Sequence, residues 1–163
     1  MNSQSTTLDQ VLSWVRVDLA PQHRQPSNVM VLVATVASLL GSLAADAALV
    51  AVGTAIFPST KGFVHFRFSD YAKLTVIGVV FACIGWPIVT RISSAPRWVY
   101  LRLAIAVTIV LLAPDLWIYL RGEPATAVGV LVCMHLAIAV VTYNSMVRIA
   151  PVRAVGEVRR FRP

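Results

Sequence analysis

Four polar side chains interrupt stretches of the sequence that are otherwise apolar: Asp46, Asp115, His135 and Asn144. Carboxylates and an imidazole can bind and release protons, so Asp46 and His135 are candidate titrating groups of a proton relay or a polar substrate site. A charged side chain at the centre of a membrane helix costs about 2.5–3.5 kcal/mol, so such groups normally face a bundle interior and pair there. Their chemistry therefore depends on the helices that position them.

Four apolar stretches are long enough to cross a membrane: residues 28–56, 70–90, 98–120 and 125–147. A crossing helix needs about 20 predominantly apolar residues. The composition agrees, because 58% of the residues are hydrophobic and 13% are charged, whereas soluble domains carry about 25% charged residues. The sequence predicts an all-α membrane protein whose transmembrane domain, residues 28–147, is a four-helix bundle.

Two polar segments flank this bundle. In residues 1–27, a capping box formed by Thr7 and Gln10 precedes a stretch with apolar residues on one face. This pattern predicts a short amphipathic helix over residues 7–20, which either lies on the membrane surface or docks on a partner subunit. Residues 148–163 form a basic tail containing VRRFR, which we expect to lie against anionic headgroups.

Basic residues are distributed unequally about the predicted spans. Ten lie on the side of the termini and the middle loop, against four on the other side. Because positive charge favours the cytoplasmic side, we expect a multi-pass protein of the inner (plasma) membrane with both termini in the cytoplasm. The ten are Arg16, Arg24, Arg91, Arg97, Arg102, Arg148, Arg153, Arg159, Arg160 and Arg162; the four are Lys61, Arg67, Lys73 and Arg121.

This topology gathers Asp46, Lys73, Asp115 and His135 in the outer half of the bundle. At ~1.5 Å per residue, Asp46 and His135 lie about 15 Å from the outer ends of their spans, and Asp115 about 8 Å. The cluster has two interpretations, a functional proton or substrate site and an interhelical clamp that pairs Asp115 with Arg121 or Asp46 with Lys73. We favour the clamp. The remainder of the spans, toward the cytoplasm, is expected to be plain lipid-facing hydrocarbon.

The first span carries the small residues Ala37, Gly41 and Ala45 at a spacing of four. Such a face permits close helix approach, either inside the bundle, with Gly129 of the fourth span as a receiver, or against another membrane subunit. In the loop after this span, GFVHFRF alternates apolar and polar residues, which predicts a short extended segment. The segment could also be an edge for strand addition by a partner, but we favour an aromatic-belt loop.

Several classes of function find no support in the sequence. The basic residues lie beside apolar runs and form no nucleic-acid stripe. No nucleotide-binding, nucleophile-elbow or metalloprotease motif is present, and no cleavable signal peptide precedes the first span. His135 has no second ligand three or four residues away on its helix, and no C-x-x-C pair exists. We expect neither catalysis nor a metal or cofactor.

Three segments resemble a family of small four-span actinobacterial membrane proteins of unknown function: DYAKLTVIGV (70–79), LLAPDLWIYLRGEPATA (111–127) and MHLAIAVVTY (134–143). In size and span count the chain is also similar to the LucB accessory subunit of mycobacterial Mce lipid-import complexes. That resemblance implies a non-catalytic subunit that binds membrane lipids and packs beside the permease helices of a fatty-acid importer, stabilising or assembling it.

Two other functions are compatible with the residues. A small proton-coupled transporter would use Asp46, since the chain resembles small multidrug resistance proteins in having four short spans and a carboxylate in the first. Those proteins insert as antiparallel dimers, which the unequal distribution of Arg and Lys disfavours. An intramembrane enzyme using Asp46, Asp115 and His135 is the least favoured hypothesis.

Overall fold

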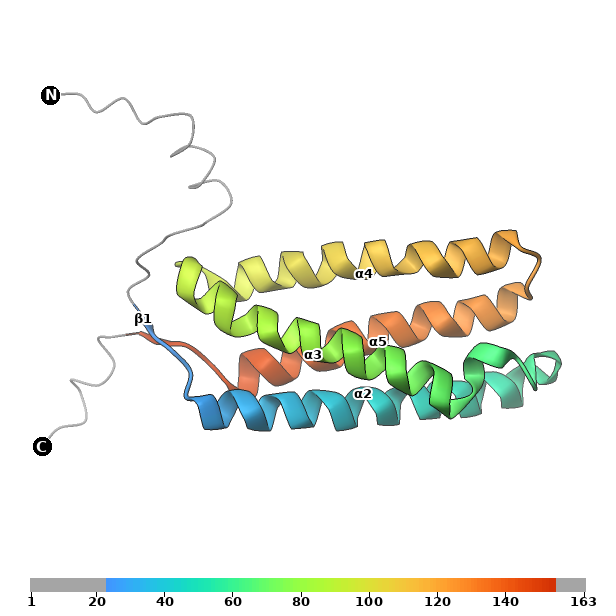
Figure 1. Ribbon diagram of the computed structural model, residues 1–163, viewed down its shortest axis with the longest axis horizontal. Coiled ribbons are helices and arrows are strands. Elements are labelled where there is room, and N and C mark those ends of the chain that lie inside the picture. The colour runs from blue at the N-terminus through green and yellow to red at the C-terminus, as the bar shows by residue number, and fades with distance from the viewer. Residues whose placement is uncertain (1–22, 155–163) are drawn as a thin grey trace, which may run out of the picture.

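Four long helices dominate the computed structural model, which describes residues 23–154 (Figure 1). They are α2 (Asn28–Ile56), α3 (Phe68–Ile92), α4 (Pro96–Leu120) and α5 (Ala125–Ile149). Two short 3-10 helices, η1 (Pro58–Thr60) and η2 (Val64–Phe66), follow α2, and two-residue strands, β1 (His23–Arg24) and β2 (Arg153–Ala154), flank the bundle. The amphipathic helix predicted over residues 7–20 and most of the basic tail lie outside the described residues.

All four helices are long and apolar enough to cross a membrane, which confirms the predicted all-α class and the number of spans. They lie side by side, so the bundle has two ends (Figure 1). The terminus end contains the start of α2, the end of α5 and the α3–α4 connection. The loop end contains η1, η2 and the turn at Gly122 between α4 and α5.

Each connection ends its helices by recognisable local chemistry. The Ser27 side chain accepts a hydrogen bond from the Met30 N–H at 3.3 Å and so caps α2. Pro96 is the first residue of α4. Proline suits this position because the N–H groups of the first helical turn make no hydrogen bond within the helix. At the terminus end, β1 and β2 pair antiparallel and bring the segments before α2 and after α5 together. The His23 and Gln25 side chains both contact the Thr90 carbonyl at the end of α3.

The extended segment predicted after α2 is wrong, because residues 64–66 form the 3-10 helix η2. Backbone hydrogen bonds of 3.1 Å from Phe63 to Thr60 and 3.0 Å from Phe66 to Phe63 turn the chain repeatedly. Gly62 has φ +89°, which L side chains rarely adopt, and so reverses the chain between the two 3-10 helices. The Phe63 and Phe66 rings then meet edge to face, 5.0 Å apart. Both rings also pack against buried side chains of α3 and α5, and this tertiary packing overrides the alternating pattern.

The closest helix pair is α2 with α5, whose contact depends on small residues of α2. Its interior face repeats every four residues, through Ala34, Ser38, Ser42 and Asp46, all fully buried. Gly41 lies so close to α5 that a Cβ there would be 2.9 Å from the Val141 side chain. Gly129, which we expected to pack against this small-residue face, has open space around it. Gly41 packs against Val141 instead. Ala37 and Ala45 are half-buried at the edge of this interface.

The half of the bundle near the termini holds its main core, so the prediction of plain lipid-facing hydrocarbon there is wrong. Trp86 of α3 is fully buried, and its indole N–H donates to the Ala150 carbonyl at 2.9 Å. Its ring meets Tyr100 of α4 edge to face at 5.1 Å, and the Tyr100 hydroxyl donates to the Ala82 carbonyl at 3.0 Å. Buried aromatic rings with satisfied polar groups thus join α3, α4 and the end of α5.

Gly53→Ala should destabilise the bundle, because a Cβ at residue 53 would lie 2.6 Å from the Val130 side chain of α5. Valine is stiff about χ1 and cannot easily turn away, so we expect a loss of about 1–3 kcal/mol. Thermal unfolding in detergent measures it. Val130→Ala should restore stability in the double variant. The control Gly129→Ala has free space and should be neutral or slightly stabilising; equal melting temperatures for the two glycine variants would contradict this packing.

Candidate functional site

Asp46 of α2 is the most deeply placed ionisable group of the site. Its side chain is fully buried, and the Thr75 hydroxyl of α3 donates to its Oδ2 at 2.6 Å. Its other oxygen, Oδ1, has no hydrogen-bond partner among the described residues. A buried carboxylate oxygen without a donor is costly. Oδ1 of Asp46 can therefore hold a proton, which would remove the buried charge.

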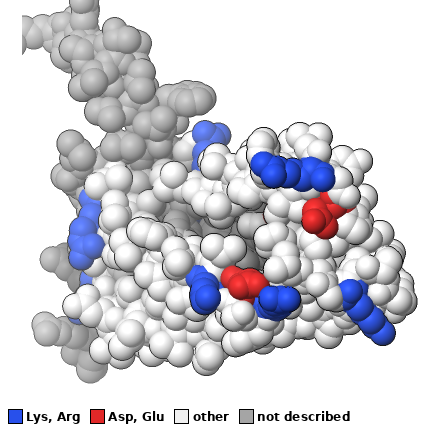
Figure 2. All heavy atoms as spheres, turned by 45° about the vertical axis from the view of Figure 1, so that its right-hand side comes forward, with Lys and Arg blue, Asp and Glu red and all other residues white. Residues whose placement is uncertain are grey.

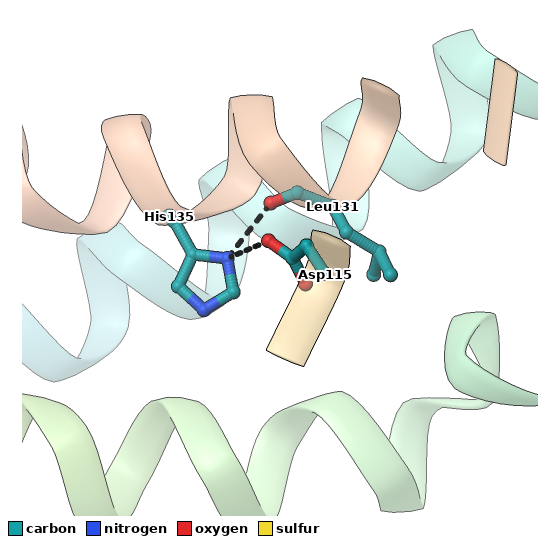
Figure 3. Close-up of polar contacts among 3 residues, drawn as sticks. All are labelled: Asp115, Leu131 and His135. Atoms are coloured by element: carbon teal, nitrogen blue, oxygen red, sulfur yellow. Dashed lines mark hydrogen bonds and ion pairs between the residues drawn. The ribbon is translucent and has the colours of Figure 1, made fainter. Parts of the chain in front are cut away.

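The second pair joins α5 to α4. Nδ1 of His135 lies 3.0 Å from Oδ2 of Asp115 and 3.0 Å from the carbonyl oxygen of Leu131, as Figure 3 shows. A backbone carbonyl can only accept a hydrogen bond, so Nδ1 carries the proton. One N–H cannot point fully at two oxygens, which leaves Asp115 Oδ2 without a well-aligned hydrogen bond. The pair is thus held by short-range electrostatics more than by ideal hydrogen-bond geometry.

The two members of this pair differ in access. The Asp115 side chain is 5% exposed, whereas that of His135 is 27% exposed. The imidazole therefore reaches the surface of the bundle, whereas the carboxylate is enclosed between α4 and α5. Asp46 and His135 are also near enough to interact electrostatically.

The structure brings together three of the four residues predicted to form the polar cluster. Lys73 is excluded, because it lies on the exposed face of α3. Tyr71, Thr75 and Val79 are buried at intervals of four residues, which turns Lys73 to the other side of the helix. The predicted Asp46–Lys73 clamp is therefore wrong, and Thr75 takes the place of the lysine.

The predicted Asp115–Arg121 clamp is also wrong. The Arg121 guanidinium lies 4.8 Å from the centre of the Trp117 ring on its own helix. Arg121 is exposed at the loop end, while Asp115 is buried against α5. Asn144 is not part of the cluster either, because its amide donates to the Val140 carbonyl at 2.8 Å.

Sequence reasoning missed Thr75 and two further buried hydroxyls. Ser42, one turn from Asp46 on α2, and Thr142 of α5 each have a buried hydroxyl oxygen with no partner among the described residues. Their signal was present, since Ser38, Ser42 and Asp46 recur every four residues and share a face. Of the three hydroxyls, only that of Thr75 donates to a buried carboxylate, at 2.6 Å from Asp46 Oδ2.

The arrangement can clamp helices or hold and pass a proton. Asp46–Thr75 links α2 to α3, and His135–Asp115 links α5 to α4, so each polar pair fastens one pair of neighbouring helices. Within residues 23–154 no group of three His, Cys, Asp or Glu side chains is arranged to hold a metal ion.

Thr75→Val should destabilise the bundle by about 1–3 kcal/mol, because it removes the donor to a buried carboxylate and leaves that group unpaired. Asp46→Asn in the same chain should recover part of the loss, since a neutral amide is cheaper to bury. Thermal unfolding of the two single variants and the double variant gives the coupling energy. Thr108→Val is the control, because Thr108 donates only to its own helix, at 2.7 Å. Additive effects of the two changes would show that the pair is not coupled.

A comparison with known families matches residues 19–151, a range that includes all four helices. The matching family is described as a family of unknown function, DUF6069. No curated protein shows significant similarity to the chain, and no solved structure does. Because the match covers most of the sequence, this four-helix protein belongs to the DUF6069 family.

Proposed function

We propose that the protein is a non-catalytic accessory subunit of a larger membrane complex. The observation that carries this proposal is how little of α4 is covered by the rest of the bundle. Only Pro96, Tyr100 and Asp115 are buried among its 25 residues. The other three helices each bury more of their length. One side of α4 is therefore free to contact another membrane protein.

The uncovered side of α4 is a regular apolar stripe. Leu103, Val107, Val110 and Trp117 recur at intervals of four, three and seven residues and are 45–68% exposed. Residues at this spacing share one helix face. Such a row supplies the close-packed side chains by which membrane helices associate.

The interior polar groups also support a structural role. Thr75 and His135 are both engaged with carboxylates on neighbouring helices. Clamps of this kind define helix positions without requiring a reaction. A subunit that stabilises a partner needs such a defined shape.

We further propose that the partner is the permease of a Mce-type lipid importer, which the subunit stabilises or helps to assemble. The resemblance in size and span count to the LucB accessory subunit supports this choice. The proposal places the protein in the inner (plasma) membrane with the terminus end in the cytoplasm. The exposed arginines of that end support this orientation: Arg24, Arg91, Arg97, Arg102, Arg148 and Arg153.

A photo-crosslinking residue introduced at Val110 in native cells should capture a permease subunit of such an importer. Val110 is 68% exposed at the middle of the apolar stripe, so a docked helix would lie within reach. The control is the same residue at Phe81, which is 71% exposed but lies on α3. Mass spectrometry of the crosslinked band identifies the partner.

Three outcomes of the crosslinking and of a native purification decide the proposal. Capture of the permease at Val110 and not at Phe81, with the same permease present in stoichiometric amount after native purification, supports it. Purification as a homo-oligomer with no other membrane subunit would overturn the accessory role. Stoichiometric recovery of a different membrane complex would retain that role and reject the Mce-type partner.

One observation favours a second function, proton-coupled transport through Asp46. Its Oδ1 is buried and lacks a donor, so protonation would relieve the cost of burying a charge. A carboxylate that alternates between charged and neutral forms can couple a conformational change to proton movement. His135, with which it interacts electrostatically, is a second group that can bind and release a proton.

Under this second function, Asp46→Asn should abolish the proton-driven efflux of a cationic dye such as ethidium, measured as ethidium uptake into everted membrane vesicles. The amide of asparagine keeps the shape of the carboxylate but cannot bind and release a proton at physiological pH. Glu123→Gln, an exposed change at the loop end, should leave efflux unaltered. Ethidium efflux equal in the Asp46→Asn variant and the unaltered protein would exclude Asp46 as the coupling group.

A further inference from the structure

We propose that the groove between α4 and α5 binds an anionic phospholipid, with an acyl chain along the groove and the headgroup between Arg97 and Arg148. This inference concerns a surface other than the apolar stripe of α4 and does not rest on the accessory role. The groove, its wall chemistry and the charge at its end each support it.

The groove is an apolar trough of about 280 Å³. Its α4 wall extends from Leu101 to Leu112, and its α5 wall includes Leu136 and Val140. Eleven residues of helix rise about 16 Å. One leaflet accounts for half of the ~30 Å hydrocarbon core, or about 15 Å. The groove therefore has the length of an acyl chain confined to a single leaflet.

Two polar residues in the groove wall direct hydrogen bonds to carbonyls of their own helices. The Thr108 hydroxyl donates to the Ala104 carbonyl at 2.7 Å, and the Asn144 amide donates to the Val140 carbonyl at 2.8 Å. Both bonds remain within the residue's own helix. The wall thus presents mainly hydrocarbon, which suits an acyl chain.

Two arginines on different helices flank the groove at the terminus end. Arg97 lies one turn before Leu101 on α4, and Arg148 lies one turn after Asn144 on α5; both are exposed. Tyr143, which lines the groove, donates its hydroxyl hydrogen bond to the Arg97 carbonyl at 3.4 Å. This contact fixes Arg97 at the mouth of the groove, where a phosphate could bridge the two guanidinium groups.

Within residues 23–154, the charged side chains at the terminus end are all basic. The acidic residues between 23 and 154 are Asp46, Asp70, Asp115 and Glu123, and all of them lie in the half of the bundle nearer the loop end. On the face that Figure 2 shows, with the loop end turned forward, each acidic side chain lies beside a Lys or Arg. Among the residues that the structure describes, no acidic side chain lies beside Arg97 or Arg148. Basic pockets between membrane helices at a cytoplasmic surface bind anionic lipid headgroups in this way.

Native mass spectrometry of the full chain in detergent tests the site. Dioleoyl phosphatidylglycerol should bind on the order of tenfold or more tightly than dioleoyl phosphatidylcholine, since two arginines contact its anionic headgroup. Arg97→Gln with Arg148→Gln should reduce phosphatidylglycerol binding to the phosphatidylcholine level. The matched control is Arg67→Gln with Arg121→Gln, two exposed arginines of the loop end, which should leave the preference intact.

A second variant separates the groove from general surface charge. Ala139→Phe fills the groove on its α5 side and should weaken binding of both lipids, with circular dichroism confirming that the bundle is folded. Ala104→Phe makes the same test from the α4 wall. The proposal is overturned if phosphatidylglycerol binding survives the Arg97/Arg148 change. It is equally overturned if both folded groove-filling variants bind the two lipids as the unaltered protein does.

Discussion

The close approach of α2 and α5 is the contact on which the rest of the structure depends. In a lipid bilayer there is little hydrophobic drive between helices, so they associate where small residues let their surfaces meet. Gly41 and Gly53 allow this, because side chains of α5 occupy the space that a Cβ would take. The pairing of β1 with β2 extends the same contact beyond the helices. The first and last helices therefore form a rigid base, against which α3 and α4 are placed.

Two polar pairs and one aromatic cluster attach the remaining helices to that base. Asp46 fastens α3 through Thr75, and His135 fastens α4 through Asp115. Toward the terminus end, Trp86 joins α3 to α4 and to the residue that follows α5. These attachments are local, so most of α4 remains uncovered. A stable core with one exposed helix is the shape expected of a subunit that completes a larger assembly, which is why we favour that role over transport.

The two surfaces of α4 have different properties and so suit different occupants. The stripe through Val107 and Val110 is apolar and convex, which suits a neighbouring helix. The groove toward α5 is concave and ends between Arg97 and Arg148, which suits a lipid with an anionic headgroup. Both occupants can be present together, since the surfaces lie on different sides of the helix. A bound lipid would then support α4 from one side while a partner subunit packs on the other.

The sequence by itself determined the number and class of the helices and the presence of Asp46, Asp115 and His135 inside them. Hydropathy and length are local properties, and a charge within an apolar stretch is visible without a fold. Only the tertiary structure decided which side chains these three residues contact. By charge alone, Lys73 would be the expected ion-pair partner of Asp46. The rotation of α3 instead turns Lys73 outward and places the Thr75 hydroxyl against Asp46. The aromatic core around Trp86 was equally hidden, because which apolar side chains meet depends on how four helices are rotated about their axes, and no single helix encodes that rotation.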